Sequence, residues 1–355
     1  MKKLLLIRFS ALGDVAMLAP IVKEAATALP DIEFTVLSKP FCAPLFQGLA
    51  PNVRFRGADI KGDYHGISGL GRLYHELKAE HYDYVADMHG VLRTHYLTLR
   101  LCLSGHKVAR INKRRAERRA LTASGEKKRM RQLCTSFDKY REVLRALPIP
   151  GKERLDSLHD RGGQKGSVIS FDNVDPTVCR MLAMAPDGAR RIGIAPFAAH
   201  KGKIYPLEKM EQVIETITAE DSSAHIYLFG GGGAERDMMM RWQQRWQGRV
   251  TAASPALGSM SSELQLMSRL DVMLSMDSAN MHLASLVGTR VVSLWGATHP
   301  YAGFLGWGQS LSDCVQIPLD CRPCSIFGNK PCHRGDFACM NGITPRSVAG
   351  VVMSY

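Results

Sequence analysis

The sequence predicts an α/β protein made of two Rossmann-like domains. The chain has 355 residues, which is more than one ordinary hydrophobic core accommodates. Short apolar runs typical of strands alternate with amphipathic helical patterns, the order that builds parallel sheets from βαβ units. This alternation stops near residue 147 and begins again near residue 191. We therefore expect two facing domains of the same design.

The first half carries the elements of one domain. Its strand-like runs are Lys3–Phe9, Glu33–Leu37, Tyr84–Met88 and, more weakly, Lys107–Arg110. Its helical patterns are Asp14–Leu29, Leu70–Glu80, Arg93–Cys102 and Thr135–Ala146. Residues 147–167 are rich in Gly, Pro and charge, which predicts an interdomain linker. We place the N-terminal domain at residues 1–165.

The second half repeats this order of elements. Its strand-like runs are Arg191–Ala195, Ala224–Phe229, Asp271–Ser275 and Val291–Trp295. Its helical patterns are Leu207–Ile217, Ala234–Trp246, Ser262–Arg269 and Ala279–Val287. We place the C-terminal domain at residues 166–340 and expect the last segment, 341–355, to pack back on the N-terminal domain.

The composition is typical of a soluble globular protein, with 45% hydrophobic and 22% charged residues. The apolar start MKKLLLI is interrupted by Arg8, Gly13 and Asp14, which argues against an export signal. No later stretch reaches the eighteen or so apolar residues of a membrane span. The nine cysteines then indicate a reducing cytoplasm, where structural disulfides are disfavoured.

The net charge of +13 is concentrated in one stretch. Residues 107–131 contain eleven Lys and Arg against two Glu, a local net charge of +9. Such a stretch can be a solvated helix face, a nucleic-acid site, or a surface for an anionic bilayer or phosphorylated lipid. The sequence has neither zinc-finger spacing nor aromatic residues interleaved with these basic ones, so we do not expect nucleic acid as a partner.

Asp14 follows the first predicted strand at the point where a helical pattern begins. The strand LLLI is followed by Arg8, Ser10, Gly13 and Asp14. Ligands of open α/β sheets bind at the carboxyl ends of strands, so a carboxylate here is placed for catalysis. Aspartate is also a common helix cap, and the spacing alone leaves both interpretations open.

Two loops of the second half could approach a nucleotide diphosphate. Lys201 and Lys203 follow the strand that ends at Ala195, and a lysine there could neutralise a phosphate, although a solvated loop is the simpler interpretation. Gly230 to Gly233 close the next strand and would let the backbone come close to a ligand.

A third segment, SMDSANMHLASLVG, predicts a strand followed by a helix N-terminus. Asp277 or Ser278 can cap this helix, and Gly288 is a suitable end for it. Its free amides and dipole would favour an anion such as a pyrophosphate. His282 lies one turn into the helix, where a packing role is as reasonable as a functional one. Thr298, after the next strand, could add a hydroxyl to the same phosphate pocket.

Several motifs in order give the chain a family resemblance. RFSALGD, KIYP, GGGG with AE, MDSANMHLASLVGTRVVSLWGATHP and the CRPC tail resemble the pattern of glycosyltransferase family 9, the ADP-heptose:lipopolysaccharide heptosyltransferases. The resemblance implies a GT-B fold. In that fold two facing Rossmann-like domains enclose a cleft, with the acceptor site mostly on the first domain and the nucleotide-sugar site mostly on the second.

The resemblance also implies roles for particular residues. Asp14 matches the carboxylate proposed as the general base, and Lys203 matches the lysine that contacts the donor phosphates; we count both as catalytic. Asp277 matches the aspartate of the donor site. Ser278, Ala279 and His282 stand where the family usually has Thr, Gly and His, so two of the three positions depart from the pattern. The further donor-site residues that we expect are Ser10, Gly13, Lys201, Gly231, Gly232 and Thr298.

The acceptor site is expected on the first domain. In DMHGVLRTHY, the residues Asp87, His89 and Arg93 resemble a family region near the cleft, although Asp87 could equally tie a loop to its strand. The basic stretch would meet the carboxylates and phosphates of a lipopolysaccharide acceptor at a membrane face. Its candidate acceptor residues are Arg114, Arg115, Arg118 and Arg119.

The cysteine-rich tail allows more than one interpretation. Cys321 and Cys324 form CxxC, and Cys332 and Cys339 follow with a wider spacing. Four cysteines could ligate a structural zinc ion, but buried thiols or a redox pair fit this spacing better. We expect neither a catalytic metal nor a cofactor, because helix amides and basic residues can stabilise a leaving diphosphate.

The sequence therefore predicts an inverting, metal-independent glycosyltransferase at the cytoplasmic face of the inner membrane. ADP-heptose is the expected donor, and an inner-core lipopolysaccharide of the Kdo–lipid A type is the expected acceptor. Two alternatives remain, a family 9 transferase of another nucleotide sugar and a non-catalytic protein that binds nucleotide or anionic lipid.

Overall fold

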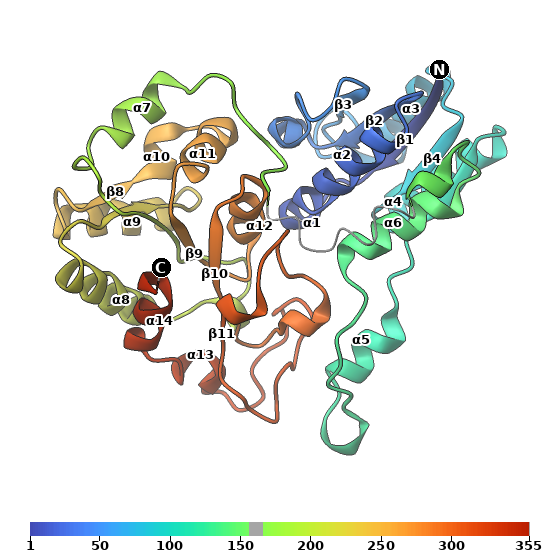
Figure 1. Cartoon of the computed structure of the whole chain (residues 1–355). Coiled ribbons are helices and arrows are strands. Elements are labelled where there is room, and N and C mark those ends of the chain that lie inside the picture. Colours follow the sequence, from blue (N-terminus) through green and yellow to red (C-terminus); the bar gives the residue numbers. More distant parts are fainter. Residues whose placement is uncertain (156–165, 355) are drawn as a thin grey trace. The chain divides into compact units, whose positions relative to one another are not determined.

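Two parallel β-sheets organise residues 1–155 and 166–354, the part of the chain that the computed structural model describes (Figure 1). The described residues divide into two units. The first comprises residues 1–114 and 134–155, and the second comprises residues 115–133 and 166–354. Each unit has its own sheet and its own hydrophobic core, so each is described separately.

The first unit is built on a five-stranded parallel sheet in the order β3-β2-β1-β4-β5. The strands are β1 (Lys2–Ile7), β2 (Ile32–Ser38), β3 (Val53–Gly57), β4 (Tyr84–Asp87) and β5 (Lys107–Arg110). Strand β1 is central because its run Leu4 to Ile7 is fully buried, as expected for a strand covered on both faces. Consequently the segment after β1, which leads into α1 and Asp14, lies at the middle of the sheet's carboxyl edge.

Helices connect the strands of this unit, and α6 follows the last of them. They are α1 (Leu12–Ala16), α2 (Leu18–Ala28), α3 (Gly66–Ala79), α4 (Leu92–Leu103) and α6 (Ser136–Ala146). The side chain of Thr135 caps α6 by accepting a hydrogen bond from the Asp138 amide at 3.1 Å. Residue Tyr140 on α6 is buried and reaches the loop after β1, so α6 contributes directly to the site described below.

The second unit has a six-stranded parallel sheet in the order β11-β10-β9-β6-β7-β8. The strands are β6 (Arg191–Ala195), β7 (His225–Leu228), β8 (Val250–Ala252), β9 (Val272–Met276), β10 (Arg290–Leu294) and β11 (Cys314–Val315). Strand β6 lies between β9 and β7, so the loops that follow β6, β9 and β10 share one edge of the sheet.

The second unit has nine α-helices among its described residues. They are α5 (Arg115–Leu121), α7 (Pro176–Leu182), α8 (Leu207–Glu220), α9 (Ala234–Arg245), α10 (Ala253–Leu257), α11 (Met260–Met267), α12 (Ala279–Leu286), α13 (Ala338–Asn341) and α14 (Pro345–Met353). None of the described helices is long and apolar enough to cross a membrane.

Residues 115–133, here called the basic arm, cluster with the second unit, although the sequence analysis assigned residues 1–165 to one N-terminal domain. The arm is attached to loops of the second unit by specific contacts. The Leu133 amide donates to the Tyr301 carbonyl at 2.8 Å, and Lys128 Nζ donates to the Asp320 carbonyl at 2.6 Å. Three of the basic residues that we predicted for the acceptor therefore belong to the second unit.

The C-terminal helix also differs from expectation. We expected segment 341–355 to pack on the N-terminal domain, but α14 packs on α8 inside the second unit. Its residues Val348, Ala349 and Val352 are fully buried in the core formed by β6, β7, β9 and β10. The apolar face of α14 explains the difference, because this face is already buried in the core of the second unit.

Candidate functional site

Asp14 lies on α1, just beyond the carboxyl end of β1, and its carboxylate is held by several contacts. Asp14 Oδ2 is 2.8 Å from Nη2 of Arg8, whose side chain is almost completely buried. The same carboxylate accepts a hydrogen bond from the Ala11 amide at 3.3 Å. The hydroxyl of Tyr140 donates to the Asp14 carbonyl at 3.0 Å, and the Arg8 guanidinium lies 5.5 Å from the Tyr140 ring. The Asp14 carboxylate thus has a fixed position while its side chain stays 24% exposed.

Cations surround the neighbouring loop after β4. Burial of His89, reinforced by the charges of Arg8, Lys113 and Arg93, lowers the pKa of its imidazole to about 3. His89 Nε2 lies 3.3 Å from the Ser10 hydroxyl. The charges of three cations thus act on a single buried histidine, an arrangement suited to an anionic ligand. Of these cations, Arg93 was among the predicted acceptor residues, whereas Lys113 was noted only as part of the basic stretch 107–131.

Asp87 holds the β4 loop in shape. Its Oδ1 accepts hydrogen bonds from the amides of His89 at 2.9 Å and Gly90 at 2.8 Å, and its side chain is fully buried. Oδ2 is 3.7 Å from His95 Nδ1. These contacts favour the loop-tying interpretation of Asp87 that the sequence analysis left open, whereas Arg93 in the first turn of α4 is exposed.

The four arginines predicted for the acceptor have different environments. Arg114 Nη2 is 2.5 Å from Glu142 Oε1 in the first unit. The Arg118 guanidinium lies 5.5 Å from the Phe304 ring and 5.6 Å from the Phe327 ring in the second unit. Arg115 and Arg119 are exposed on α5. Only these last two are thus presented to solvent without a described aromatic or carboxylate contact.

In the second unit, Lys203 and Asp277 meet at the carboxyl edge of the sheet. Lys203 Nζ is 2.8 Å from Asp277 Oδ2, and both side chains are largely buried. Lys203 belongs to a short 3-10 turn, Lys201–Lys203, in the loop after β6, whereas Asp277 directly follows β9. Residues from two neighbouring strand ends therefore form one ion pair, as the sequence predicts for residues of a common site.

The helix after β9 begins beside this ion pair. Ser278 is the N-cap residue of α12, and its hydroxyl lies 3.3 Å from that of Ser275. Ala279 is the first helical residue, so its added methyl group stands beside the free amides of the helix N-terminus. His282 and Thr298 are buried, and Thr298 follows β10 on the same edge of the sheet. The structure thus places these four residues and the ion pair in one unit.

Two backbone amides of the glycine loop after β7 already donate hydrogen bonds to side chains of the same unit. Glu235, in the first turn of α9, accepts a hydrogen bond from the Gly231 amide at 2.6 Å. Gly230 donates to the Ser254 hydroxyl at 3.1 Å. Gly232 is exposed, with open space where a Cβ would stand. Of the two glycines predicted for the donor, Gly232 is thus the more accessible. Lys201 is exposed, and Ser10 and Gly13 lie with Asp14 in the first unit.

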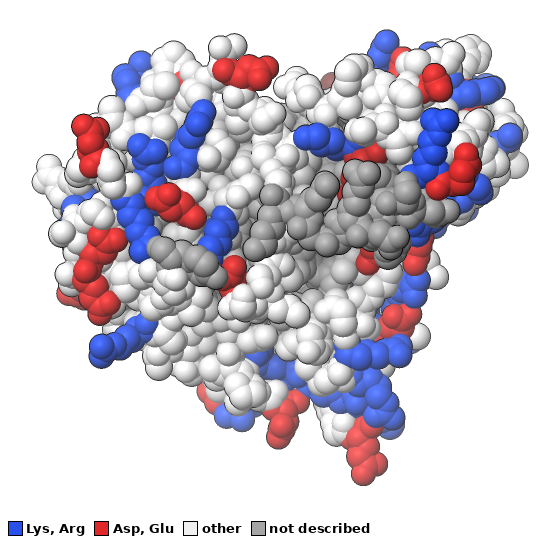
Figure 2. Space-filling model, in the orientation of Figure 1, with Lys and Arg blue, Asp and Glu red and all other residues white. Residues whose placement is uncertain are grey.

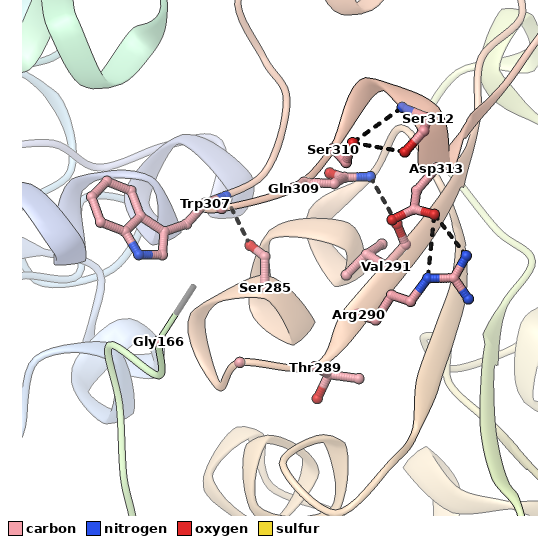
Figure 3. A pocket seen from close by; sticks show the side chains of 12 residues that line it. Gly166, Ser285, Thr289, Arg290, Val291, Trp307, Gln309, Ser310, Ser312 and Asp313 are labelled. Carbon is pink, nitrogen blue, oxygen red and sulfur yellow. Dashed lines mark hydrogen bonds and ion pairs between the residues drawn. The ribbon is translucent and has the colours of Figure 1, made fainter. Parts of the chain in front are cut away.

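A cavity of about 280 Å³ lies at the opposite edge of the second sheet. Figure 3 shows Arg290, at the start of β10, pointing toward Asp313, with which it forms an ion pair of 2.7 Å. The Trp307 amide donates to the Ser285 hydroxyl at 3.1 Å. None of the residues predicted for the donor or acceptor lines this cavity. We therefore keep it apart from the candidate site.

The cysteine-rich tail forms no described metal centre. Cys321, Cys324, Cys332 and Cys339 line one small cavity, and all four thiols are free. Within residues 1–155 and 166–354, no group of three or more His, Cys, Asp or Glu side chains is placed to hold a metal ion. Burial raises the pKa of the Cys324 and Cys339 thiols, and of the four cysteines only Cys339 is buried.

Comparisons with known proteins agree with this architecture. The family described as Glycosyltransferase family 9 (heptosyltransferase) matches residues 70–329. No curated protein sequence matches the chain significantly. Among solved structures, the E. coli heptosyltransferase WaaC with ADP is 16% identical, with 99% of each chain covered and a TM-score of 0.64.

Two further solved structures are similar over nearly the whole chain. E. coli ADP-heptose lps heptosyltransferase II is 17% identical, with 100% of this chain and 98% of that chain covered and a TM-score of 0.67. A family 9 glycosyl transferase from Veillonella parvula is 17% identical with the same coverage and a TM-score of 0.70. These likenesses show the GT-B fold, and with the family match over residues 70–329 they establish that the chain belongs to glycosyltransferase family 9, the heptosyltransferase family.

Proposed function

We propose that this family 9 member transfers a heptose from ADP-heptose to an inner-core lipopolysaccharide acceptor of the Kdo–lipid A type. The Lys203–Asp277 pair carries the proposal, because it sets a cation at the carboxyl edge of the second sheet beside the N-terminus of α12. A lysine and helix amides are the groups that stabilise a departing diphosphate. Two solved structures of this fold are described as a heptosyltransferase with ADP and an ADP-heptose heptosyltransferase, which supports this donor.

The proposed reaction is a single displacement. The acceptor hydroxyl oxygen attacks the anomeric carbon of the heptose, and its proton passes to the Asp14 carboxylate. The bond between the anomeric carbon and the phosphate oxygen breaks, and ADP leaves with its negative charge facing Lys203 and the α12 amides. One displacement inverts the anomeric configuration. Because Lys203 and the amides supply the positive field, this route needs no divalent ion.

The acceptor contacts are proposed from the charge of the first unit and of the basic arm. Arg93 and Lys113 act on His89 in the first unit and suit the carboxylates and phosphates of the acceptor. Basic side chains of the arm gather at the lower right of Figure 2, where Figure 1 shows α5 and the loop after it. Arg115 and Arg119 there can meet anionic groups at a membrane surface. We propose peripheral contact with the cytoplasmic face of the inner membrane on this basis.

The deciding experiment compares wild type with Asp14→Asn and measures release of ADP from ADP-heptose with a Kdo-containing lipid A acceptor in EDTA. We expect the wild type to turn over in EDTA and the variant to lose at least about 100-fold in rate, since a general base contributes that much. Binding of ADP should stay within about twofold in both proteins, because the substitution leaves Lys203, Asp277 and the α12 amides, the proposed diphosphate contacts of the second unit, unchanged. Asp31→Asn, an exposed carboxylate of the same unit, is the matched control.

One observation favours a second candidate function. The contacts of Asp14 with Arg8 and the Ala11 amide would also suit a purely structural carboxylate. A non-catalytic protein that binds nucleotide would show ADP binding without turnover in wild type and variant alike. Wild-type turnover only with another nucleotide sugar would instead change the donor, and full activity of Asp14→Asn would remove Asp14 from the chemistry.

A further inference from the structure

Gly328, in the cysteine-rich tail, lies directly against the side chain of Lys203. A Cβ placed on Gly328 would stand 2.6 Å from Cγ, 3.3 Å from Cδ and 3.2 Å from Cε of Lys203. The first of these distances is shorter than any real carbon–carbon contact, and all three atoms belong to the stem that carries Nζ to Asp277. The absence of a side chain at residue 328 is what allows the lysine stem to take its observed path.

The backbone of Lys203 is held from another side. A Cβ on Gly202 would stand 2.8 Å from the Ala297 Cβ and 2.9 Å from the Gly328 carbonyl oxygen. The Ala297 amide donates to the Gly202 carbonyl at 2.9 Å. The loop after β6, the loop after β10 and the tail thus pack together around one lysine. A side chain at either Gly202 or Gly328 would collide with a neighbouring loop or with the lysine stem.

The tail segment that contains Gly328 is anchored to the same strand end. Arg322 is 4% exposed and donates to the carbonyls of Trp295 at 2.9 Å and Thr298 at 3.0 Å. The amides of Cys324 and Ser325 both donate to the Ala297 carbonyl, at 3.1 and 3.2 Å. These bonds fix the tail on the loop after β10, so Gly328 has little room to withdraw from Lys203.

We propose that Gly328 is a positioning residue for Lys203, and that the tail segment 321–330 acts as a wall holding the lysine stem against Asp277. The role of Lys203 toward the donor diphosphate rests on the proposed function. A methyl group at residue 328 displaces the stem, and Nζ with it, from the place where the phosphates are neutralised. The backbone also requires glycine here, since φ is +74° at Gly328.

The experiment must separate this collision from the strain of a side chain at positive φ. Gly335, in the same tail, has φ +78°, and a Cβ there would meet nothing within 4 Å. Gly335→Ala is therefore the matched control for Gly328→Ala. Lys203→Ala and the double variants Lys203→Ala/Gly328→Ala and Lys203→Ala/Gly335→Ala complete the set. Calorimetry measures ADP binding, NMR titration measures binding of adenosine, which lacks the phosphates, and thermal unfolding is followed for every variant.

We expect Gly328→Ala to weaken ADP binding at least about tenfold, the loss that accompanies one charge-assisted hydrogen bond. Adenosine binding should change less than about twofold, and Gly335→Ala should bind both ligands like wild type. In the Lys203→Ala background, Gly328→Ala should add no further loss of ADP binding. The double variant Lys203→Ala/Gly328→Ala should also melt at the same temperature as Lys203→Ala/Gly335→Ala, because the truncated residue 203 no longer has the stem that collides. This last comparison tests the collision even if Gly328→Ala alone does not fold.

The outcomes distinguish the inference from the proposed function. If Lys203→Ala binds ADP like wild type, the proposed role of Lys203 fails, and the positioning role fails with it. If Lys203→Ala weakens ADP binding while Gly328→Ala does not, the positioning role alone is wrong. Equal effects of Gly328→Ala with and without the Lys203 stem would likewise overturn it, because they would show a general disturbance of the tail.

Discussion

His89 is the most strongly perturbed of the predicted acceptor-side residues. Its side chain is 8% exposed, and burial together with the charges of Arg8 and Lys113 lowers its pKa to about 3. The imidazole is therefore neutral throughout the range in which an enzyme of this kind works. It can exchange a hydrogen bond with the Ser10 hydroxyl, 3.3 Å away, but it brings no charge to an anionic acceptor.

This environment predicts an acid-dependent loss of stability. An unfolded histidine binds a proton near pH 6.5, whereas folded His89 does so only near pH 3. The unfolded state thus binds more protons in this window, and stability falls as pH falls from 6.5 toward 3. At pH 5 His89 alone costs about 2 kcal/mol. We expect His89→Gln to remove that part of the loss of stability between pH 7 and 5, measured by urea unfolding.

The exposed His75 supplies the control for this prediction. His75→Gln should leave the difference in stability between pH 7 and pH 5 as in wild type. A His89→Gln variant that destabilises on acidification as much as wild type would show that His89 is hydrated or protonated in the folded protein, contrary to the buried geometry.

The residues of the donor site were predictable to different degrees. Lys203 and Asp277 each stand in a motif that follows a strand, and the parallel sheet brings such strand ends together. On the acceptor side, Lys113 beside the loop after β4 and Tyr140 beside Asp14 were not predicted as site residues, because their positions depend on the packing of β5 and α6. Gly328 could not be found at all, since a glycine that must lack a side chain is recognised only when its neighbour in space is known.

At the scale of elements, long buried runs were predicted well and short or half-exposed ones were not. The central strands β1, β4, β6, β9 and β10 are mostly apolar and mostly buried, and the sequence identifies all of them. Strand β3 was missed because its sequence, VRFRG, places arginines on an exposed edge. Strands β8 and β11 are only three and two residues long, too short for a periodic signal.

The predicted helix Asp14–Leu29 is two helices with a break at Met17. Pro20 explains the break, because it has no amide hydrogen to donate to the carbonyl of Ala16 in a continuous helix. Asp14 consequently lies on the short helix α1 rather than at the start of a long one. Its position at the end of β1 still agrees with the prediction.

The arginines of the basic arm lie in two kinds of environment, one packed against aromatic rings and one exposed to solvent. Arg118 packs on the rings of Phe304 and Phe327, whereas Arg115 and Arg119 are exposed. Arg118→Ala should therefore destabilise the second unit by about 0.5–2 kcal/mol through the lost cation–π contacts. Arg115→Ala/Arg119→Ala should leave stability unchanged and raise the KM for the anionic acceptor several-fold. Chemical unfolding and acceptor titrations measure the two effects.

The control for the arm removes two charges elsewhere. Arg241 and Arg269 are exposed on or just after other helices of the second unit, and Arg241→Ala/Arg269→Ala keeps the same net charge as the arm variant. If both double variants raise the acceptor KM equally, the total charge matters and the arm has no special place. If neither does, the acceptor does not contact α5.

At the scale of the whole molecule, the excess of positive charge is a property that no single contact accounts for. The chain carries 46 Lys and Arg against 33 Asp and Glu, and eleven of the basic residues fall within residues 107–131. Charge of this kind says little about the fold, which the apolar runs determine, but it governs encounters with anionic partners. The two-domain α/β plan was therefore predictable from hydrophobic patterning alone, whereas the charge indicated only the class of partner.

This charge predicts that membrane contact depends on salt. We expect the protein to sediment with vesicles of anionic lipid at about 0.1 M salt, where the Debye length is about 10 Å, and to be released at about 1 M, where it is about 3 Å. Vesicles of neutral lipid should not bind it at either concentration. The arm variant Arg115→Ala/Arg119→Ala should be released at lower salt than Arg241→Ala/Arg269→Ala, because each lost basic residue near the surface removes about 1 kcal/mol. Binding that persists at high salt would instead indicate apolar insertion, and the exposed Met130 in the arm would then be the side chain to replace first.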